Sequence, residues 1–319
     1  MEPEATDRRR EKAALEADIR RTRRAVLVVN TRSRRGARFY SEAKRRLTEA
    51  GMVLDAAYPV RHAERLPEIV RFALGQGHRF VIIGGGDGTI SSVVDHFAYD
   101  EVVFGVLPLG TANSFARTLG IPLDLAGAID VLLQGKVADV DLGRIDGDYF
   151  ANGASIGLPA AVGRATPPGL KRWLGRAGYA VVAVNELLHH EPFRCSVTMD
   201  GETRTVEALD VRIANGAYQG GVLVAGDASV ESGEIVLHIL KGASRWQLVR
   251  EWARVAAGAP FAPGDVEDLR ARALRIETDP VQDVAIDGEV VTRTPIDVSV
   301  ARNALLVMVP QSFEDRDRD

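Results

Sequence analysis

The sequence predicts an α/β fold of two domains: an N-terminal domain with a doubly wound parallel sheet, and a mainly antiparallel, β-rich C-terminal domain. In residues 25–142, short apolar runs alternate with helical patterns, which is typical of a parallel sheet covered on both faces. After residue 142, most strand-like segments are separated only by turns, which favours antiparallel pairing. With 319 residues, 46% of them apolar, the chain can bury a core in each domain.

The apolar runs of the N-terminal half are short and rich in Val, Ile and Leu, as buried parallel strands are. The stretch 66–76 has apolar residues at positions 66, 69, 70, 73 and 74, which form one face of a helix. Gly51 follows a helical pattern and is placed to end it. The predicted strands are 25–30, 53–58, 80–83 and 102–107, and the predicted helices are 39–50, 66–76, 90–97 and one beginning near Ala112.

In the C-terminal half, two helices interrupt a succession of strands. Asp287 and Gly288 lie between two strand-like runs and form a strong signal for a tight hairpin. The last apolar run is expected to return to the first domain. The predicted strands are 149–152, 194–199, 205–214, 234–240, 274–277, 283–286, 290–292 and 304–309, and the predicted helices are 170–189 and 245–257. The predicted organisation is a charged helix in 1–24, a first domain in 25–142 plus 297–312, a second domain in 143–296, and a tail in 313–319.

Charge is unevenly distributed along the chain. The net charge is −4, but residues 1–46 hold 15 Lys or Arg and 7 Asp or Glu, a local net of +8. The basic part is either a solvated charged helix or a surface for an anionic partner, such as phosphates or a membrane. We expect no nucleic-acid partner, because the chain as a whole is not basic.

Three features predict the cytoplasm as the location. The single cysteine, Cys195, permits no intramolecular disulfide and lies in a strand-like run, where burial is expected. Residues 1–24 are charged throughout, so they do not read as a signal peptide. No apolar run reaches the roughly 18–20 residues that span a bilayer. Contact with the inner face of the membrane would therefore be peripheral.

The segment 81–89 holds four glycines between a predicted strand and a predicted helix. Glycine lets a ligand approach the backbone closely, and the N-terminus of a helix offers free N–H groups and the positive end of its dipole. A carboxylate beside phosphates is repulsive unless a cation lies between them, so Asp87 is a candidate for contact with Mg²⁺ carried by a nucleotide. The alternative is a tight turn in which Asp87 caps a helix.

A second loop repeats this geometry, because the predicted strand 102–107 runs into Gly110 and a helix opened by Thr111. Thr111 is either a ligand contact or an ordinary N-cap. In a doubly wound sheet, both loops emerge at the carboxyl edge, where ligands bind. Asn30 ends the first strand at this edge. The arginines that follow it, including Arg32, either offset nucleotide charge or are ordinary surface residues.

Five motifs occur in the order found in one family: GGDGT at 85–89, LPLGTANSFAR at 107–117, DLG at 141–143, FANGASIG at 150–157 and DGE at 287–289. Together they resemble the soluble bacterial diacylglycerol-kinase and lipid-kinase family, which is related to sphingosine kinases. The resemblance runs from about residue 25 to residue 309. The GGDG motif alone also resembles loops of NAD kinases and 6-phosphofructokinases, whereas the runs at 107–117 and 150–157 favour lipid kinases.

The resemblance implies a transferase of lipid metabolism and phospholipid biosynthesis, with ATP and Mg²⁺ as cofactors. It would move the γ-phosphate of ATP to a hydroxyl of diacylglycerol or a similar lipid. Glu289 matches the family's proton acceptor, although the residues alone indicate only the first position of a strand. Asp87 and Asp141 match carboxylates tied to magnesium through water. The residues expected at the nucleotide are Asn30, Arg32, Gly85, Gly86, Asp87, Gly88, Thr89, Ile90, Ser91, Gly110, Thr111 and Asn113.

Many family members hold a structural Mg²⁺ at an Asp-Gly turn of the second domain. In the matching stretch of this chain, Ser232 replaces the carboxylate, and Ser229 and Glu234 would coordinate through their carbonyl oxygens. Either this metal site is weakened, or Glu231 or Glu234 substitutes for the missing ligand.

Other departures leave two alternatives open. The family's Asn-Pro-x-Ser-Gly reads NTRSR at 30–34, and a Thr that often ends the second strand is Ala57. The first alternative is an NAD kinase-like enzyme. The second is a catalytically inactive protein that binds nucleotide or lipid. For a lipid kinase we expect a lipid substrate and transient peripheral membrane contact, with a basic, Trp-containing helix in 158–188 either at the membrane or in the core. Exposed edge strands leave a homodimer open.

Overall fold

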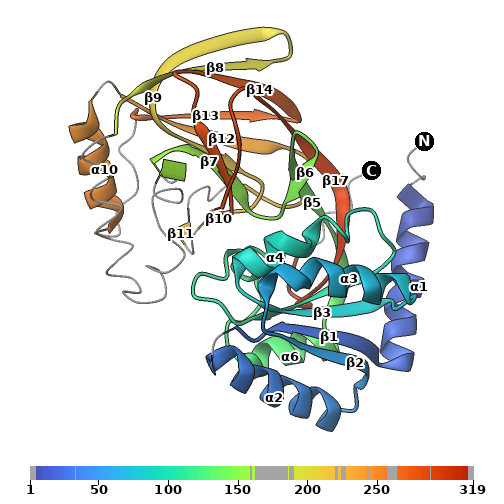
Figure 1. Ribbon diagram of the computed structural model, residues 1–319. Helices are drawn as coiled ribbons and strands as arrows, with labels where there is room; N and C mark the ends of the chain where they lie inside the picture. Colours follow the sequence, from blue (N-terminus) through green and yellow to red (C-terminus); the bar gives the residue numbers. More distant parts are fainter. Residues whose placement is uncertain are drawn as a thin grey trace.

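In a computed structural model, the chain has an N-terminal domain of parallel strands and helices and a C-terminal, β-rich antiparallel domain (Figure 1). This confirms the predicted fold class. The structure describes residues 5–32, 34–158, 160–161, 186, 190–219, 222–223, 228–242, 244–256, 264–287 and 289–314. In this part of the chain, no helix is long and apolar enough to cross a lipid bilayer.

The N-terminal sheet is parallel, with the strand order β4-β3-β1-β2. Because β1 pairs with both β2 and β3, the sheet is built outward in both directions from β1. The carboxyl ends of β1 and β3 therefore form a topological switch point, where ligands bind in open α/β sheets. The strands are β1 (Arg24–Asn30), β2 (Val53–Val60), β3 (Phe80–Gly85) and β4 (Val103–Pro108).

Helices cover both faces of this sheet, as Figure 1 shows: α3 and α4 lie on one face, and α2 and α6 on the other. Gly51 ends α2 with a φ of +83°, as predicted, and lets Met52 donate to the carbonyl of Leu47. The helices are α2 (Arg34–Glu49), the 3-10 turn η1 (Ala63–Arg65), α3 (Leu66–Gly75), α4 (Asp87–Val94), α5 (Ser114–Thr118) and α6 (Leu125–Gln134).

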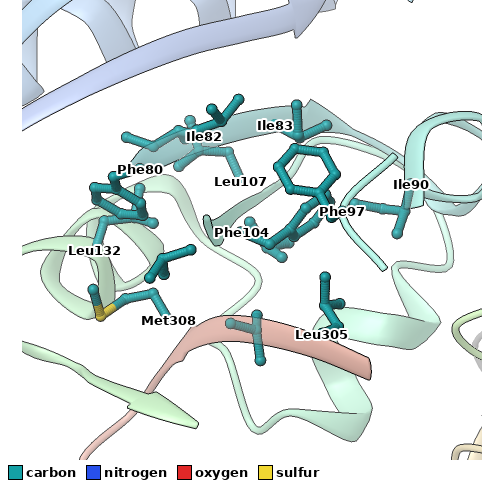
Figure 2. Packing of buried hydrophobic residues seen from close by; sticks show 14 of the residues in the cluster. Phe80, Ile82, Ile83, Ile90, Phe97, Phe104, Leu107, Leu132, Leu305 and Met308 are labelled. Atoms are coloured by element: carbon teal, nitrogen blue, oxygen red, sulfur yellow. The ribbon is translucent and has the colours of Figure 1, made fainter. Parts of the chain in front are cut away.

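The core of the domain lies between this sheet and its helices. Every residue of β3 is buried, and the same holds for β4. Phe97, at the end of the α4 segment, meets Phe104 of β4 edge to face, with ring centroids 4.7 Å apart (Figure 2). The apolar runs therefore form buried strands, as their composition predicts.

The charged N-terminal segment forms the predicted helix, α1 (Ala5–Thr22), and this helix packs on the fold. Leu15 and Ile19 are buried. A carboxylate oxygen of Glu16 accepts from the backbone N–H of Val137 at 2.9 Å, and Arg20 donates to the carbonyl of Gly135 at 2.9 Å. The helix thus covers the start of β5 (Lys136–Ile145).

The C-terminal domain packs a second apolar core between antiparallel strands. Its helix α10 (Arg245–Ala256) lies at the outer edge in Figure 1. Its strands are β6 (Asp148–Phe150), β7 (Gly153–Gly157), β8 (Phe193–Met199), β9 (Glu202–Ala214), β10 (Tyr218–Gln219), β11 (Val222–Leu223), β12 (Ile235–Lys241), β13 (Val266–Ala271), β14 (Ala273–Asp279), β15 (Asp283–Ile286) and β16 (Glu289–Arg293).

One long strand joins the two domains. β17 (Ile296–Val309) pairs with β14 and β5 in antiparallel fashion and with β4 in parallel, so a single sheet runs through both domains (Figure 1). The prediction of 304–309 covered only its apolar half, because 296–303 alternates apolar and polar residues. β5 and β13 were not predicted. The predicted strand 149–152 was partly wrong, because the chain bends at residues 151–152 between β6 and β7. The predicted helix 170–189 lies almost entirely outside the described residues.

Candidate active site

Two glycine-containing loops touch at the carboxyl edge of the parallel sheet. A Cβ atom built on Gly110 would lie 2.5 Å from the Cα atom of Gly86 and 2.8 Å from Oδ1 of Asn113. Built on Gly86, it would lie 3.0 Å from the Cα atom of Gly110. The N–H of Leu109 donates to the carbonyl of Gly85 at 2.9 Å. Only glycine allows this approach, so the two predicted loops form one continuous backbone surface.

Asn113 shapes the second loop. Its φ is 51°, a left-handed conformation, and its Oδ1 accepts from the N–H of Gly110 at 2.8 Å while its Nδ2 donates to the carbonyl of Gly110 at 3.1 Å. The side chain is buried and engaged with its own loop. Thr111 is exposed on the same loop, on the side open to solvent.

Asp87 is the first residue of α4 and links the two loops. Its Oδ1 accepts from the backbone N–H of Phe115 in α5 at 3.3 Å. The capping alternative is therefore correct in part, because Asp87 binds the start of the neighbouring helix and not that of α4. Gly88, which follows, is exposed, and a Cβ atom there would meet nothing within 4 Å. The space in front of this helix start is open.

The loop after β1 is fastened to the glycine-rich loop. Nδ2 of Asn30 donates to Oγ1 of Thr89 at 3.0 Å, and Oδ1 of Asn30 accepts from the backbone N–H of Arg32 at 3.1 Å. The structure thus brings together three of the predicted segments. Ile90 is buried in the core, so it can contribute only its backbone, and that N–H already donates to the carbonyl of Gly86.

The hairpin between β15 and β16 brings a second carboxylate to this edge. Ile286 pairs with Glu289, so Asp287 lies in the turn of the predicted hairpin. The N–H of Asp287 donates to the carbonyl of Gly153 at 3.1 Å. Burial, and then the negative charge of Asp87, raise the pKa of Asp287 to about 7. The two carboxylates are therefore close enough for their charges to interact.

Sequence reasoning selected Glu289 and passed over Asp287. Glu289 is exposed at the start of β16, whereas Asp287 lies at the turn itself with a φ of 47°. The sequence did contain one signal for Asp287, which is its position. It lies at the turn of the predicted hairpin, and the turn is the part of a hairpin that extends furthest from its strands. Asn152 and Ser91 also lie at Asp287 and favour its charged form.

Several polar atoms at this junction are buried. Among the described residues, Oδ2 of Asp287 and both side-chain polar atoms of Asn152 have no hydrogen-bond partner. Such groups cost about 1–3 kcal/mol each unless a ligand or water meets them. Two interacting carboxylates, buried polar atoms and a glycine loop fit a magnesium nucleotide. The described residues contain no group of three His, Cys, Asp or Glu that could hold a metal ion.

Asp141 binds backbone groups. Its carboxylate accepts from the N–H of Gly233 at 2.7 Å and from that of Asn303 at 2.8 Å. Nδ2 of Asn215 donates to its carbonyl at 2.8 Å. Asp141 therefore ties β5 to β17 and to the turn that precedes β12.

The predicted second-domain metal site lies in that same turn. Oγ of Ser232 donates to the carbonyl of Glu234 at 3.0 Å, and the N–H of Ser232 donates to the carbonyl of Ser229. Each predicted carbonyl ligand thus accepts one protein hydrogen bond. The metal at this turn stays a prediction.

Comparison with known proteins identifies the family. The model for the "Diacylglycerol kinase catalytic domain" matches residues 24–145, and the model for the "YegS C-terminal NAD kinase beta sandwich-like domain" matches residues 153–309. A Pseudomonas aeruginosa protein named "Probable lipid kinase YegS-like" is 32% identical over 76% of this chain and 80% of its own length. The chain belongs to the diacylglycerol kinase and YegS-like lipid kinase family. This confirms the resemblance found in the motifs.

Two further relatives and one solved structure are also similar to this chain. The "Diacylglycerol kinase" of Bacillus subtilis (strain 168) is 29% identical over 74% of this chain and 80% of its own length. A protein of Synechocystis sp. is longer: it is 28% identical over 74% of this chain, but the match covers only 56% of it. A crystal structure of a candidate diacylglycerol kinase from Bacillus anthracis str. Sterne superposes with a TM-score of 0.77, at 22% identity, over 91% of this chain and 96% of the other. At that identity the superposition shows a shared fold.

Proposed function

We propose that this kinase transfers the γ-phosphate of ATP to a hydroxyl of diacylglycerol or a similar lipid. The observation that carries the proposal is the contact of the two glycine loops beside Asp87, whose negative charge acts on the Asp287 carboxylate of the C-terminal hairpin. The family assignment supports a kinase, and the relatives' names point to lipid acceptors.

The residues of the site divide the work as follows. The backbone of the joined glycine loops would position the phosphates, and Asp87 would hold the nucleotide's Mg²⁺. When bound, Mg²⁺ supplies positive charge that offsets the charge developing on the phosphate oxygens. Asp287 accepts the proton of the lipid hydroxyl as that oxygen bonds to the γ-phosphorus and the bond to ADP breaks. Burial, the larger cause of the raised pKa of Asp287, persists when a cation offsets the charge of Asp87, and a raised pKa suits a general base at neutral pH.

This proposal makes Asp287 the proton acceptor, whereas the family resemblance implies Glu289. A variant of each residue distinguishes the two possibilities. We expect Asp287→Asn to lower turnover about 10²–10⁴-fold, the range for general-base catalysis, while ATP affinity is retained. The exposed Glu289 should tolerate Glu289→Gln with little loss. The reverse result would make Glu289 the base, and full activity of both variants would remove the hairpin from the chemistry.

We also propose that the enzyme reaches its lipid by transient contact with a membrane. The predicted interfacial segment 158–188 lies almost entirely outside the described residues, so support comes from the lipid-kinase relatives. Cosedimentation with anionic vesicles at low salt tests this proposal, and absence of binding contradicts it. A homodimer and the absence of a nucleic-acid partner stay predictions.

NAD is the second acceptor to test. The C-terminal family model is described as NAD kinase-like in its β-sandwich, and NAD kinases share the GGDG type of loop. Supplying NAD in place of lipid in the same transfer assay distinguishes the two acceptors.

A further inference from the structure

A short helix of the N-terminal domain touches the C-terminal domain beside the proposed site. This helix, α5, contacts β10 and the bend that precedes it. In the contact, the side chain of Thr118, the last residue of α5, lies over Gly216. Gly216 is buried, and so is the hydroxyl oxygen of Thr118. The two domains therefore meet here in a close, dry contact.

This contact leaves no room for a side chain at position 216. A Cβ atom built on Gly216 would lie 2.9 Å from Oγ1 of Thr118 and 3.0 Å from its Cγ2. Nonbonded carbon atoms are most stable about 3.5–4.0 Å apart. Thr118 cannot turn both branches away, because a β-branched side chain in a helix has few allowed rotamers. A methyl group at this position would therefore push the two domains apart by about 0.5 Å.

The other end of α5 is attached to Asp87. The backbone N–H of Phe115 donates to Oδ1 of Asp87 at 3.3 Å. Phe115 and Thr118 both belong to the five-residue helix α5 and lie about one turn apart. A displacement at Thr118 therefore reaches Asp87 through a single turn of helix.

Gly216 is connected to Asp287 by backbone hydrogen bonds. The N–H groups of Asn215 and Gly216 both donate to the carbonyl of Asn152, at 2.9 Å and 3.0 Å. The next residue, Gly153, accepts from the N–H of Asp287 at 3.1 Å. The bend between β6 and β7 is thus fixed to Gly216 on one side and carries the hairpin turn on the other.

These contacts form a closed ring that crosses the domain boundary twice. One crossing is the contact of Thr118 with Gly216, and the other is the interaction of the Asp87 and Asp287 carboxylates. Because the ring is short and its parts are hydrogen-bonded, the width of the first crossing determines that of the second. We propose that Thr118 and Gly216 are positioning residues, whose contact sets the separation of Asp87 and Asp287. As a statement about catalysis, this inference rests on the proposed function.

The test compares four full-length proteins: wild type, Gly216→Ala, Thr118→Ala and the double variant. A misplacement of 1 Å can cost about 100-fold in rate, so a shift of about 0.5 Å in Gly216→Ala should lower kcat for diacylglycerol about tenfold. KM for ATP should stay within about twofold, because each glycine loop is left intact. Gly75→Ala is the matched control and should leave kcat unchanged, since a Cβ atom there meets nothing within 4 Å.

The double variant tests whether the loss is steric. Thr118→Ala removes both colliding atoms and leaves its own Cβ atom 3.5 Å from the new one, an ordinary contact. Thr118→Ala alone should therefore lower kcat less than about threefold, and the double variant should return to within about threefold of wild type. A double variant as impaired as Gly216→Ala would overturn the inference.

A second background separates positioning from a merely structural role. In Asp287→Asn the proposed base is absent, so adding Gly216→Ala should lower the residual kcat less than about twofold. A further tenfold loss in that background, or a rise in KM for ATP in place of the fall in kcat, would contradict positioning.

Amide hydrogen exchange tests the link without catalysis. The Asp287 amide should exchange about tenfold faster in Gly216→Ala and at the wild-type rate in the double variant, because the bend that accepts its hydrogen bond moves and then returns. This result supports the contact even if no lipid is phosphorylated, in which case the proposed function alone fails. Unchanged exchange and unchanged kcat in Gly216→Ala would overturn the inference. If Gly216→Ala alone does not fold, a folded double variant with near wild-type exchange gives the same support, and a double variant that also fails to fold overturns it.

Discussion

The contact between the two glycine loops predicts that a single methyl group separates them. In Gly110→Ala the new Cβ atom would lie 2.5 Å from the Cα atom of Gly86 and 2.8 Å from Oδ1 of Asn113. The first neighbour is backbone, so it cannot rotate away, and the loops must move apart. Overpacking of this kind costs about 1–3 kcal/mol. Because the loops form the proposed phosphate site, we expect ATP affinity to fall about tenfold, which corresponds to 1.4 kcal/mol.

The measurements are urea unfolding, followed by circular dichroism, and calorimetric titration with Mg²⁺ and ATP. Gly75→Ala is the matched control, since a Cβ atom on Gly75 of α3 meets nothing within 4 Å. Alanine should raise the free energy of unfolding there by about 0.5–1 kcal/mol, because Gly is unfavourable within a helix. If Gly110→Ala unfolds like wild type and binds ATP equally well, the loops do not meet as described.

Three further predictions follow from individual contacts. Burial raises the pKa of the Cys195 thiol to about 12. The native protein should therefore not react with DTNB at pH 8, a pH at which an exposed cysteine is partly thiolate, and labelling in denaturant is the control. Asn30→Ala leaves the buried Thr89 hydroxyl without its donor, and we expect a loss of about 1–3 kcal/mol in urea unfolding; an unchanged midpoint contradicts the contact. Leu15→Ala should destabilise the fold by about 2–5 kcal/mol if α1 is docked, whereas Phe72→Ala, 57% exposed, should change stability by less than about 0.5 kcal/mol.

The elements that the sequence predicts well are those with one dominant periodicity. The predicted strand 80–83 and helix 66–76 agree with β3 and α3 to within two residues. A strand buried on both faces is a continuous apolar run, and a helix buried on one face has apolar residues three or four positions apart, so the sequence shows both directly. β5 and the first half of β17 were missed for the opposite reason. Their polar residues alternate with apolar ones and form contacts between the domains, which no local window contains.

The candidate site divides in the same way. Glycine spacing predicted that the loops at Gly86 and Gly110 lie at one edge, and the structure brings them into contact. The roles of Asp87 and Asp287 could not be predicted locally, because the interaction of these carboxylates depends on how a hairpin of one domain meets a loop of the other.

The most direct test of the account is phosphate transfer from radiolabelled ATP by the wild-type chain with Mg²⁺. One reaction contains mixed micelles of diacylglycerol, and a second contains NAD. The account predicts label in the organic phase of the first reaction and none on NAD. Label on NAD would assign the other acceptor class, and label on neither, with ATP still bound, would contradict catalysis and make the chain a binding protein.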